Sequence, residues 1–230
     1  MRRADRKART ATSNVRDKLT FLRASEKLHY EFLHRLHRAG LGYVWGVDLV
    51  VWGVLRRSLL LIDGFVPLVR KGNEVAAVPL IRLQIDNALR LFACSQGSHP
   101  DEVLRALLEG KPLGRMKARD GERMTDAYLV RRFSVDFPWV AKVYEKTSGF
   151  IHLSSPGLLQ TVEKSDDRVV TFSVESRPEG KWRSDSRLEA VEAFIAATDS
   201  LLHVVGSWLK SKEVLATNWH ATASQSQGAG

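Results

Sequence analysis

The sequence contains only one cysteine, Cys94, in 230 residues. A single thiol cannot form an intramolecular disulfide, so a disulfide-stabilised secreted scaffold is excluded. Long apolar runs are also missing. The charge-free stretch in the most apolar region, Leu49 to Leu55, has 7 residues, whereas a membrane-spanning helix needs roughly 20. The basic N-terminal residues lead into more charge and not into an apolar segment, so no secretory signal is expected. These absences predict a cytoplasmic protein without membrane insertion.

Acidic residues are outnumbered by basic ones. The chain has 35 Lys and Arg against 26 Asp and Glu, a formal net charge of +9. Such an excess is common in nucleic-acid-binding proteins. Residues 1–38, however, hold 11 of the basic and 4 of the acidic side chains. Most of the basic excess therefore belongs to the N-terminal region, where residues 1–16 are predicted to be a disordered tail, and the charge alone does not indicate a nucleic-acid partner.

Apolar residues make up 44% of the chain and recur mainly at helical spacing, which predicts a single helical domain over residues 17–215. The fold class expected is mainly all-α, a helical bundle. Helices are expected at about residues 19–39, 43–70, 74–93, 100–109, 120–133, 137–152 and 186–215. The bundle is expected to consist of the segments 43–70, 74–93, 137–152 and 186–215, with the first of these in the centre because it is apolar around most of its circumference.

The periodicity changes between the last two long helices. Segments 158–163 and 169–175 are β-branched and roughly alternating, and residues 164–167 can turn between them, which predicts one inserted β-hairpin within residues 158–176. Residues 216–230 are small and polar and are predicted to be a disordered tail. Strands do not alternate with helices, which excludes a Rossmann-type sheet, and no glycine-rich phosphate loop is present.

Polar side chains follow one edge of the helix predicted at 137–152. Tyr144, Ser148 and His152 are four residues apart and fall at successive steps of about 40° around the helix. His152 is at the C-terminal end, where the helix dipole favours a protonated imidazole. These groups could form an acid–base site with two orienting hydroxyls. The alternative, which is the commoner situation, is a boundary strip whose polar tips reach water or backbone carbonyls.

A charged stripe, Arg82, Asp86 and Arg90, lies on the helix predicted at 74–93. The usual explanation for this spacing is a solvated row of ion pairs. The functional alternative is a phosphate-binding surface that faces His152. We expect Arg82, Asp86 and His152 to converge on one groove in which Asp86 holds Arg82 in place.

Taken together, Arg82 and Asp86, followed far downstream by Tyr144, Ser148 and His152, resemble the paired signatures of an uncharacterised bacterial family of HEPN-like helical proteins. The resemblance implies a metal-independent endoribonuclease of toxin or phage-defence type, without a cofactor, whose site is completed by homodimerisation.

It also implies that His152 is the catalytic histidine. The stripes themselves suggest Arg82 as its catalytic partner, with Arg90 as the alternative source of positive charge, and Asp86, Arg90, Tyr144 and Ser148 as binding residues. The sequence departs from the HEPN pattern at Lys146, where an Arg would be expected six residues before the His. Two hypotheses therefore stay open. One is the ribonuclease, and the other is a non-catalytic helical module that binds a nucleotide, RNA or another protein.

Other candidate sites are weaker. Glu31, His34 and His37 have spacing that can hold a metal, but on a charged helix such residues most often face solvent, so no metal site is expected. Trp45 and Trp52 could stack on bases, but their position on an apolar helix predicts that they belong to the core.

Overall fold

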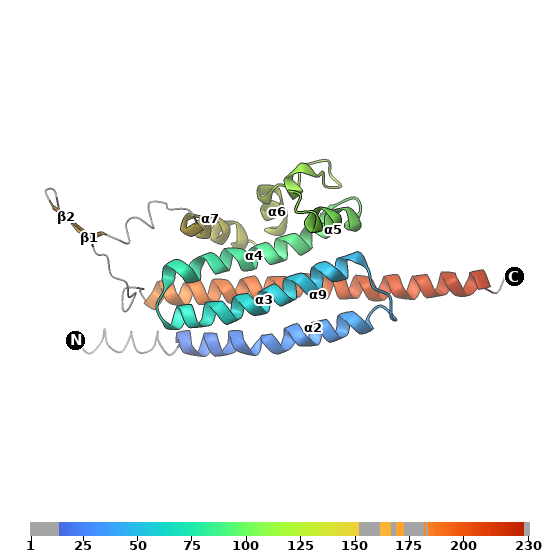
Figure 1. Ribbon diagram of the computed structural model, residues 1–230, viewed down its shortest axis with the longest axis horizontal. Helices are drawn as coiled ribbons and strands as arrows, with labels where there is room; N and C mark the ends of the chain where they lie inside the picture. The colour runs from blue at the N-terminus through green and yellow to red at the C-terminus, as the bar shows by residue number, and fades with distance from the viewer. Residues whose placement is uncertain (1–13, 152–161, 167–168, 173–181, 183, 228–230) are drawn as a thin grey trace.

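The computed structural model describes residues 14–151, 162–166, 169–172, 182 and 184–227. These residues are mainly helical, which confirms the predicted class (Figure 1). The helices are residues 14–24, α2 (Glu26–Arg38), α3 (Gly46–Arg70), α4 (Glu74–Gln96), α5 (Pro100–Leu108), α6 (Asp126–Phe133), α7 (Trp139–Ile151) and α9 (Ser184–Gln227), with one 3₁₀ turn, η1 (Leu113–Arg115). None of the described helices is long and apolar enough to cross a bilayer.

Two short strands, β1 (Val162–Asp166) and β2 (Val169–Phe172), pair antiparallel. Val162 is opposite Phe172 and Asp166 is opposite Val169, with an irregularity between Val162 and Lys164. The ladder thus includes residues 164–166, where a turn was expected. The start of the predicted first strand and the end of the predicted second strand lie outside the described residues.

The first predicted helix is interrupted at Ser25. The Ser25 hydroxyl donates to the carbonyl of Leu22 at 2.6 Å, and the Ser25 carbonyl lies 2.9 Å from Nδ1 of His29. Side-chain bonds to the backbone compete with the regular helical ladder. The apolar residues keep helical spacing on both sides of Ser25, so the spacing alone does not predict that the helix is interrupted there.

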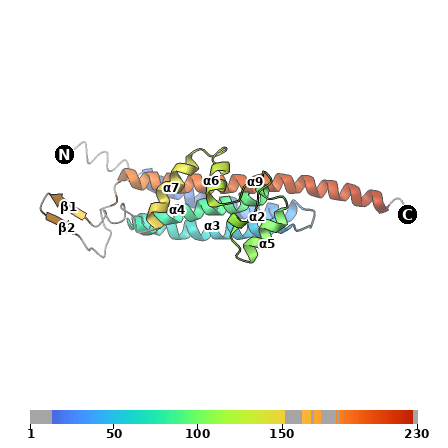
Figure 2. The ribbon, with the colours of Figure 1, turned by 90° about the horizontal axis from the view of Figure 1, so that it is seen from above.

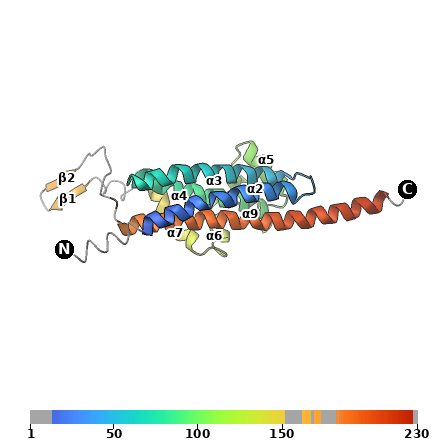
Figure 3. The same cartoon turned by 90° about the horizontal axis from the view of Figure 1, so that it is seen from below.

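The long helices α2, α3, α4 and α9 lie side by side (Figures 1 and 3). The Phe65 ring of α3 stacks on the Phe194 ring of α9, with centroids 4.1 Å apart. α4 contacts α3 and α9 on one side and α5, α6 and α7 on the other (Figure 2). The segment predicted at 137–152 is thus α7, which packs on α4 away from α2.

The sequence pointed to α3 as the central helix, whereas α4 has this position. α3 leaves Leu49, Trp52 and Leu60 at least half exposed. The prediction that Trp52 belongs to the core is therefore wrong. An apolar residue on a helix need not be buried, because the polar surface of a protein is too small to cover it completely.

Capping groups set the bounds of the helices that carry the candidate site. Asp48 accepts the Trp45 backbone N–H at 2.9 Å at the start of α3, and the Asn73 side chain accepts the Ala76 N–H at 3.1 Å at the start of α4. Gly72, with φ of 73°, allows the tight connection between them. α6 starts at Asp126 and not near residue 120, because Thr125 caps it by accepting the N–H of Tyr128.

α9 continues to Gln227, well past the predicted end at Leu215. Residues 216–227, predicted to be a disordered tail, are helical. Lys212 and Ala216 are both buried and extend the packed face of α9. Figure 1 shows that the helix then projects past the connection between α2 and α3. At the other end, residues 14–16 of the predicted N-terminal tail are helical, and residues 1–13 lie outside the described part.

Candidate functional site

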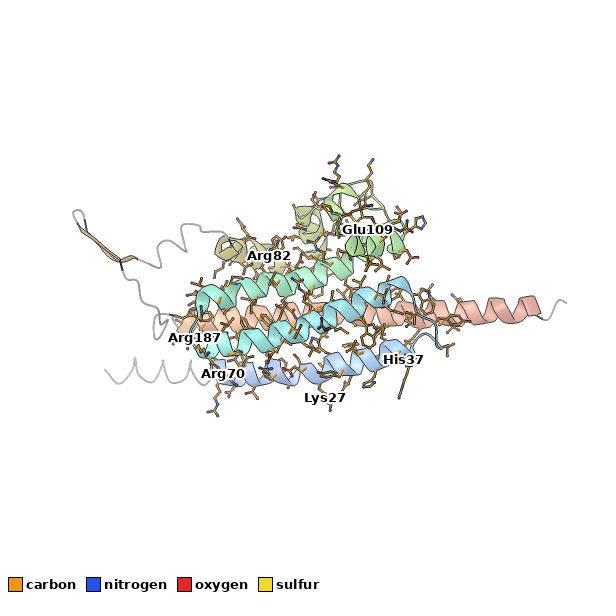
Figure 4. The ribbon with its side chains drawn as sticks, viewed as in Figure 1. Lys27, His37, Arg70, Arg82, Glu109 and Arg187 are labelled. Carbon is orange, nitrogen blue, oxygen red and sulfur yellow. The ribbon has the colours of Figure 1, made fainter. Side chains whose placement is uncertain are left out.

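The charged stripe of α4 faces α6 and α7. Arg82 lies where α4 meets α7 (Figure 4), and its guanidinium carbon is 3.1 Å from the centroid of the Tyr144 ring. Only 14% of the Arg82 side chain is exposed. A planar guanidinium stacks favourably on an aromatic face. Two of the residues that the sequence singled out, on helices far apart in the chain, are thus in contact.

Asp86 is at the centre of this contact region. Its Oδ1 lies 2.9 Å from Arg90 Nη2 and 4.0 Å from Arg82 Nη1. Its Oδ2 lies 3.6 Å from Nη1 of Arg57, which comes from α3. One carboxylate therefore faces three guanidiniums. Arg90 is the closest of the three, and Arg82 is the most distant, so the expectation that Asp86 holds Arg82 in place stays a prediction.

A second carboxylate comes from α6. Asp126 Oδ1 accepts a hydrogen bond from Arg90 Nη2 at 2.8 Å, and Asp126 Oδ2 lies 4.0 Å from Arg82 Nη2. Asp126 and Arg57 are not among the predicted site residues, because nothing in the sequence spacing shows which side chains of other helices approach the stripe. The arginine cluster is defined here as Arg57, Arg82, Arg90, Asp86 and Asp126.

Burial and charge act in opposite directions within the arginine cluster. Burial lowers the pKa of Arg82, and the opposing attraction of Asp86 and Asp126 does not compensate. Burial also disfavours the charge on Arg90, but the same two carboxylates outweigh it and raise the Arg90 pKa. Arginine nevertheless remains charged at neutral pH. The cluster thus has three positive and two negative groups, an excess of one positive charge.

Of the two described residues of the predicted polar edge, Tyr144 contacts the cluster and Ser148 does not. The Ser148 hydroxyl donates to the Tyr144 carbonyl of its own helix at 2.7 Å, which is the boundary-strip arrangement. The Tyr144 hydroxyl and the Arg82 Nε are buried without a hydrogen-bond partner among the described residues. His152 lies outside the described residues, so its predicted convergence with Arg82 and Asp86 stays a prediction.

The direction of α7 is relevant to that prediction. α7 crosses α4 obliquely, and its C-terminal end lies toward the N-terminal end of α4 (Figures 1 and 2). Lys146, which occupies the position of the expected HEPN arginine, forms an ion pair with Glu189 of α9 at 2.8 Å. The remaining turns of α7 after Tyr144, up to Ile151, are therefore directed away from Arg82 and Arg90.

A buried chain of hydrogen bonds leads from the core to the arginine cluster. His29 Nδ1 faces the Ser25 carbonyl, which can only accept, so Nδ1 carries the proton and Nε2 is an acceptor. The Ser58 hydroxyl donates to this Nε2 at 2.8 Å. Ser58 in turn accepts from Gln84 Nε2 at 2.6 Å. These bonds connect α2, α3 and α4, and all three side chains are fully buried.

The chain of hydrogen bonds continues from both the Nε2 and the Oε1 atom of Gln84. Gln84 Nε2 also donates to Thr198 of α9 at 3.0 Å, and Gln84 Oε1 accepts from Asn87 Nδ2 at 3.0 Å. Asn87 Oδ1 accepts from Arg57 Nη1 at 2.8 Å. We refer to His29, Ser58, Gln84, Thr198, Asn87 and Arg57 as the polar chain. It connects the arginine cluster to the centre of the helices.

A second buried polar group lies where α2 ends and α3 begins. Lys212 of α9 is 1% exposed, and its Nζ donates to the Leu36 carbonyl at 2.6 Å and to Asp48 Oδ2 at 2.8 Å. The other oxygen of Asp48 accepts the indole N–H of Trp208 at 2.8 Å. Both charges are therefore fully paired.

These buried polar groups were not predicted, although the sequence contains a signal for them. Gln84 lies among the apolar residues Ile81, Ile85 and Ala88 on the inner face of α4, and Lys212 follows Leu209 at the same helical spacing. A polar residue in an apolar stripe must find a buried partner. The pattern indicates that a partner exists but does not identify it.

The other candidate residues are Cys94 and the three residues of α2 with metal-binding spacing. Cys94 is buried, and burial raises its thiol pKa to about 12, so the thiol is a poor nucleophile. Glu31, His34 and His37 are exposed on α2. No group of three or more His, Cys, Asp or Glu side chains in the described part of the chain is arranged to hold a metal ion.

Comparison of the sequence with protein-family models, and of the chain with curated proteins and solved structures, gave no match. The HEPN-like resemblance therefore rests on its short motifs alone.

Proposed function

We propose that this protein is a non-catalytic module that binds RNA or a nucleotide through phosphate contacts at the arginine cluster. The observation that carries the proposal is the convergence of three guanidiniums on Asp86. Three guanidiniums offer more N–H donors than two carboxylates can accept. The cluster therefore retains donors, and one excess positive charge, for phosphate oxygens.

The exposed part of the cluster is formed by Arg57 and Arg90, whose side chains are 43% and 25% exposed. Both are held in place, Arg57 by Asn87 and Arg90 by Asp86 and Asp126. Side chains that are already ordered lose less conformational entropy when they bind a ligand. We expect Arg57 and Arg90 to contact phosphate and Arg82, beneath Tyr144, to support them.

The test compares two neighbouring arginines of α3. Arg57→Gln removes a cluster residue, whereas Arg56→Gln removes the same charge at an exposed position outside the cluster. Affinity for a short fluorescent single-stranded RNA is measured by anisotropy over a range of salt concentrations. Arg57→Gln should weaken binding about tenfold and reduce the salt slope by about one. Arg56→Gln should change the affinity less than about twofold.

Thermal unfolding monitored by circular dichroism verifies that both variants are folded. Equal effects of the two substitutions would show that binding depends only on net charge. That result, or a wild-type protein that binds neither the RNA nor ATP in the same assay, would exclude the phosphate site.

The second hypothesis is the metal-independent ribonuclease. The observation in its favour is that Arg82 packs on α7, the helix that precedes His152 in the chain. Its support is weaker, because Arg82 is covered by Tyr144 and α7 is directed toward the start of α4. In a HEPN-like enzyme, a second copy of the chain would complete the site.

Purified protein incubated with mixed RNA in EDTA separates the two functions. Cleavage by the wild type that is lost in His152→Ala would replace the binding proposal with the enzyme. No cleavage, or equal cleavage by both proteins, would exclude the enzyme. Sedimentation velocity on the same samples tests the dimer that the resemblance implies.

A further inference from the structure

A cavity of about 340 Å³ lies between α4, α9 and the segment that joins α6 to α7. Its floor includes Leu91, Cys94 and Phe133, all at most 3% exposed. None of the residues that line the cavity belongs to the arginine cluster. The volume is at the lower end of the range for small-molecule sites.

Aromatic rings form one wall of the cavity. Phe133 and Phe137 have ring centroids 4.7 Å apart, and the His203 ring of α9 contacts Phe137 edge-on at 5.6 Å. Rings in tilted and edge-on contact support one another, and all three of these rings line the cavity. The wall is therefore suited to a planar aromatic group.

Trp208 of α9 also lines the cavity, and a hydrogen bond to a buried carboxylate holds its indole ring in place. Its indole N–H donates to Asp48, a carboxylate that is 2% exposed and also paired with Lys212. A side chain held by such a buried group keeps one orientation when a ligand enters. The aromatic cavity is thus preorganised by the ion pair described above.

Two side chains of opposite charge lie at the edge of the cavity, Arg119 and Asp136. Arg119 is held against the end of α4 by two hydrogen bonds, from its Nε to the Gly97 carbonyl and from its backbone N–H to the Gln96 carbonyl, each 2.9 Å. The Nη groups of its guanidinium are the part suited to a carboxylate. Asp136 offers an acceptor for an ammonium group.

We propose that this cavity binds an aromatic zwitterion of the amino-acid type, with its ring against Phe137 and Trp208, its carboxylate at Arg119 and its ammonium group at Asp136. The proposal does not depend on RNA binding, because none of these residues belongs to the arginine cluster.

Isothermal titration calorimetry with four related probes tests each contact. L-tryptophan carries both charges, indole-3-propionate only the carboxylate, tryptamine only the ammonium group, and indole neither. We expect saturable binding, with the highest affinity for L-tryptophan and the lowest for indole. Arg119→Gln should weaken L-tryptophan and indole-3-propionate at least about tenfold and indole less than about twofold. Asp136→Asn should weaken L-tryptophan and tryptamine but not indole-3-propionate.

Two further variants serve as controls. Arg123→Gln removes an exposed arginine of the same loop outside the cavity lining and should leave all affinities unchanged. Ser207→Phe starts from an exposed rim residue of α9 and should block the cavity to every probe without altering the core. Equal losses in Arg119→Gln and Arg123→Gln, unchanged binding to Ser207→Phe, or no saturable heat with L-tryptophan would each overturn the proposal.

Discussion

His29 is fully buried, and its hydrogen bonds are those of a neutral imidazole. Burial lowers its pKa from the usual value, against the opposing effects of the Ser25 carbonyl and Glu26. The unfolded chain takes up a proton on this histidine near pH 6.5, whereas the folded chain does so only at lower pH. The free energy of unfolding is therefore greatest above that pH and decreases as the pH falls toward the folded-state pKa.

This linkage predicts that stability decreases between about pH 7.5 and about pH 5.5, with His29 contributing about 1 kcal/mol of the loss. Urea unfolding at the two pH values measures it. His29→Gln, which cannot titrate, should have a smaller pH dependence than the wild type. The same pH dependence in both proteins would show that His29 is not responsible.

Asp86 and Asp63 both form ion pairs with arginine but differ in exposure, at 20% and 74% of the side chain. Asp86→Ala would leave the three guanidiniums of the cluster with Asp126 as their one carboxylate, so it should reduce the free energy of unfolding by about 2 kcal/mol. Asp63→Ala removes only an exposed pair with Arg23 and should cost less than about 1 kcal/mol. Denaturant titration measures the free energy of unfolding of the two variants. Similar losses in both would show that the ion pairs of Asp86 are as weak as an exposed pair.

At the scale of the elements, Lys212 joins α9 to the end of α2 and the start of α3. Lys212→Met would leave Asp48 charged and buried without its cation, which should destabilise the protein by about 3 kcal/mol. Lys210→Met, at an exposed position of the same helix, should have almost no effect. Urea midpoints measure the difference. A Lys212→Met protein as stable as Lys210→Met would mean that Asp48 is satisfied without the lysine.

Helices were predictable here because their apolar spacing extends over several turns, as in α3 and α4. Their ends were less predictable, because side-chain bonds to the backbone set them. Ser25 interrupts a continuous apolar pattern, and Thr125 delays the start of α6. The extension of α9 was missed because its last turns are small and polar, and the apolar stripe that predicts a packed helix ends near Ala216.

At the scale of the whole molecule, the sequence gives the faces of each helix but not which faces meet. The spacing of Arg82, Asp86 and Arg90 fits an exposed row of ion pairs as well as a buried contact. The structure shows the buried contact, because α7 places the Tyr144 ring on the guanidinium of Arg82. The stripe and the polar edge could therefore be found from the sequence, whereas the contribution of Arg57 and Asp126 required the packing of α3 and α6.

The polar chain also limits how the long helices can be aligned. Apolar side chains on two helices can pack in several axial positions, since one aliphatic group replaces another at little cost. A slide of α3 along α4 by one turn, about 5.4 Å, would separate Ser58 from Gln84 and leave buried donors unpaired at about 1–3 kcal/mol each. The hydrogen bonds from His29 to Thr198 thus select a single axial alignment of α2, α3, α4 and α9 from those that the apolar core alone would allow.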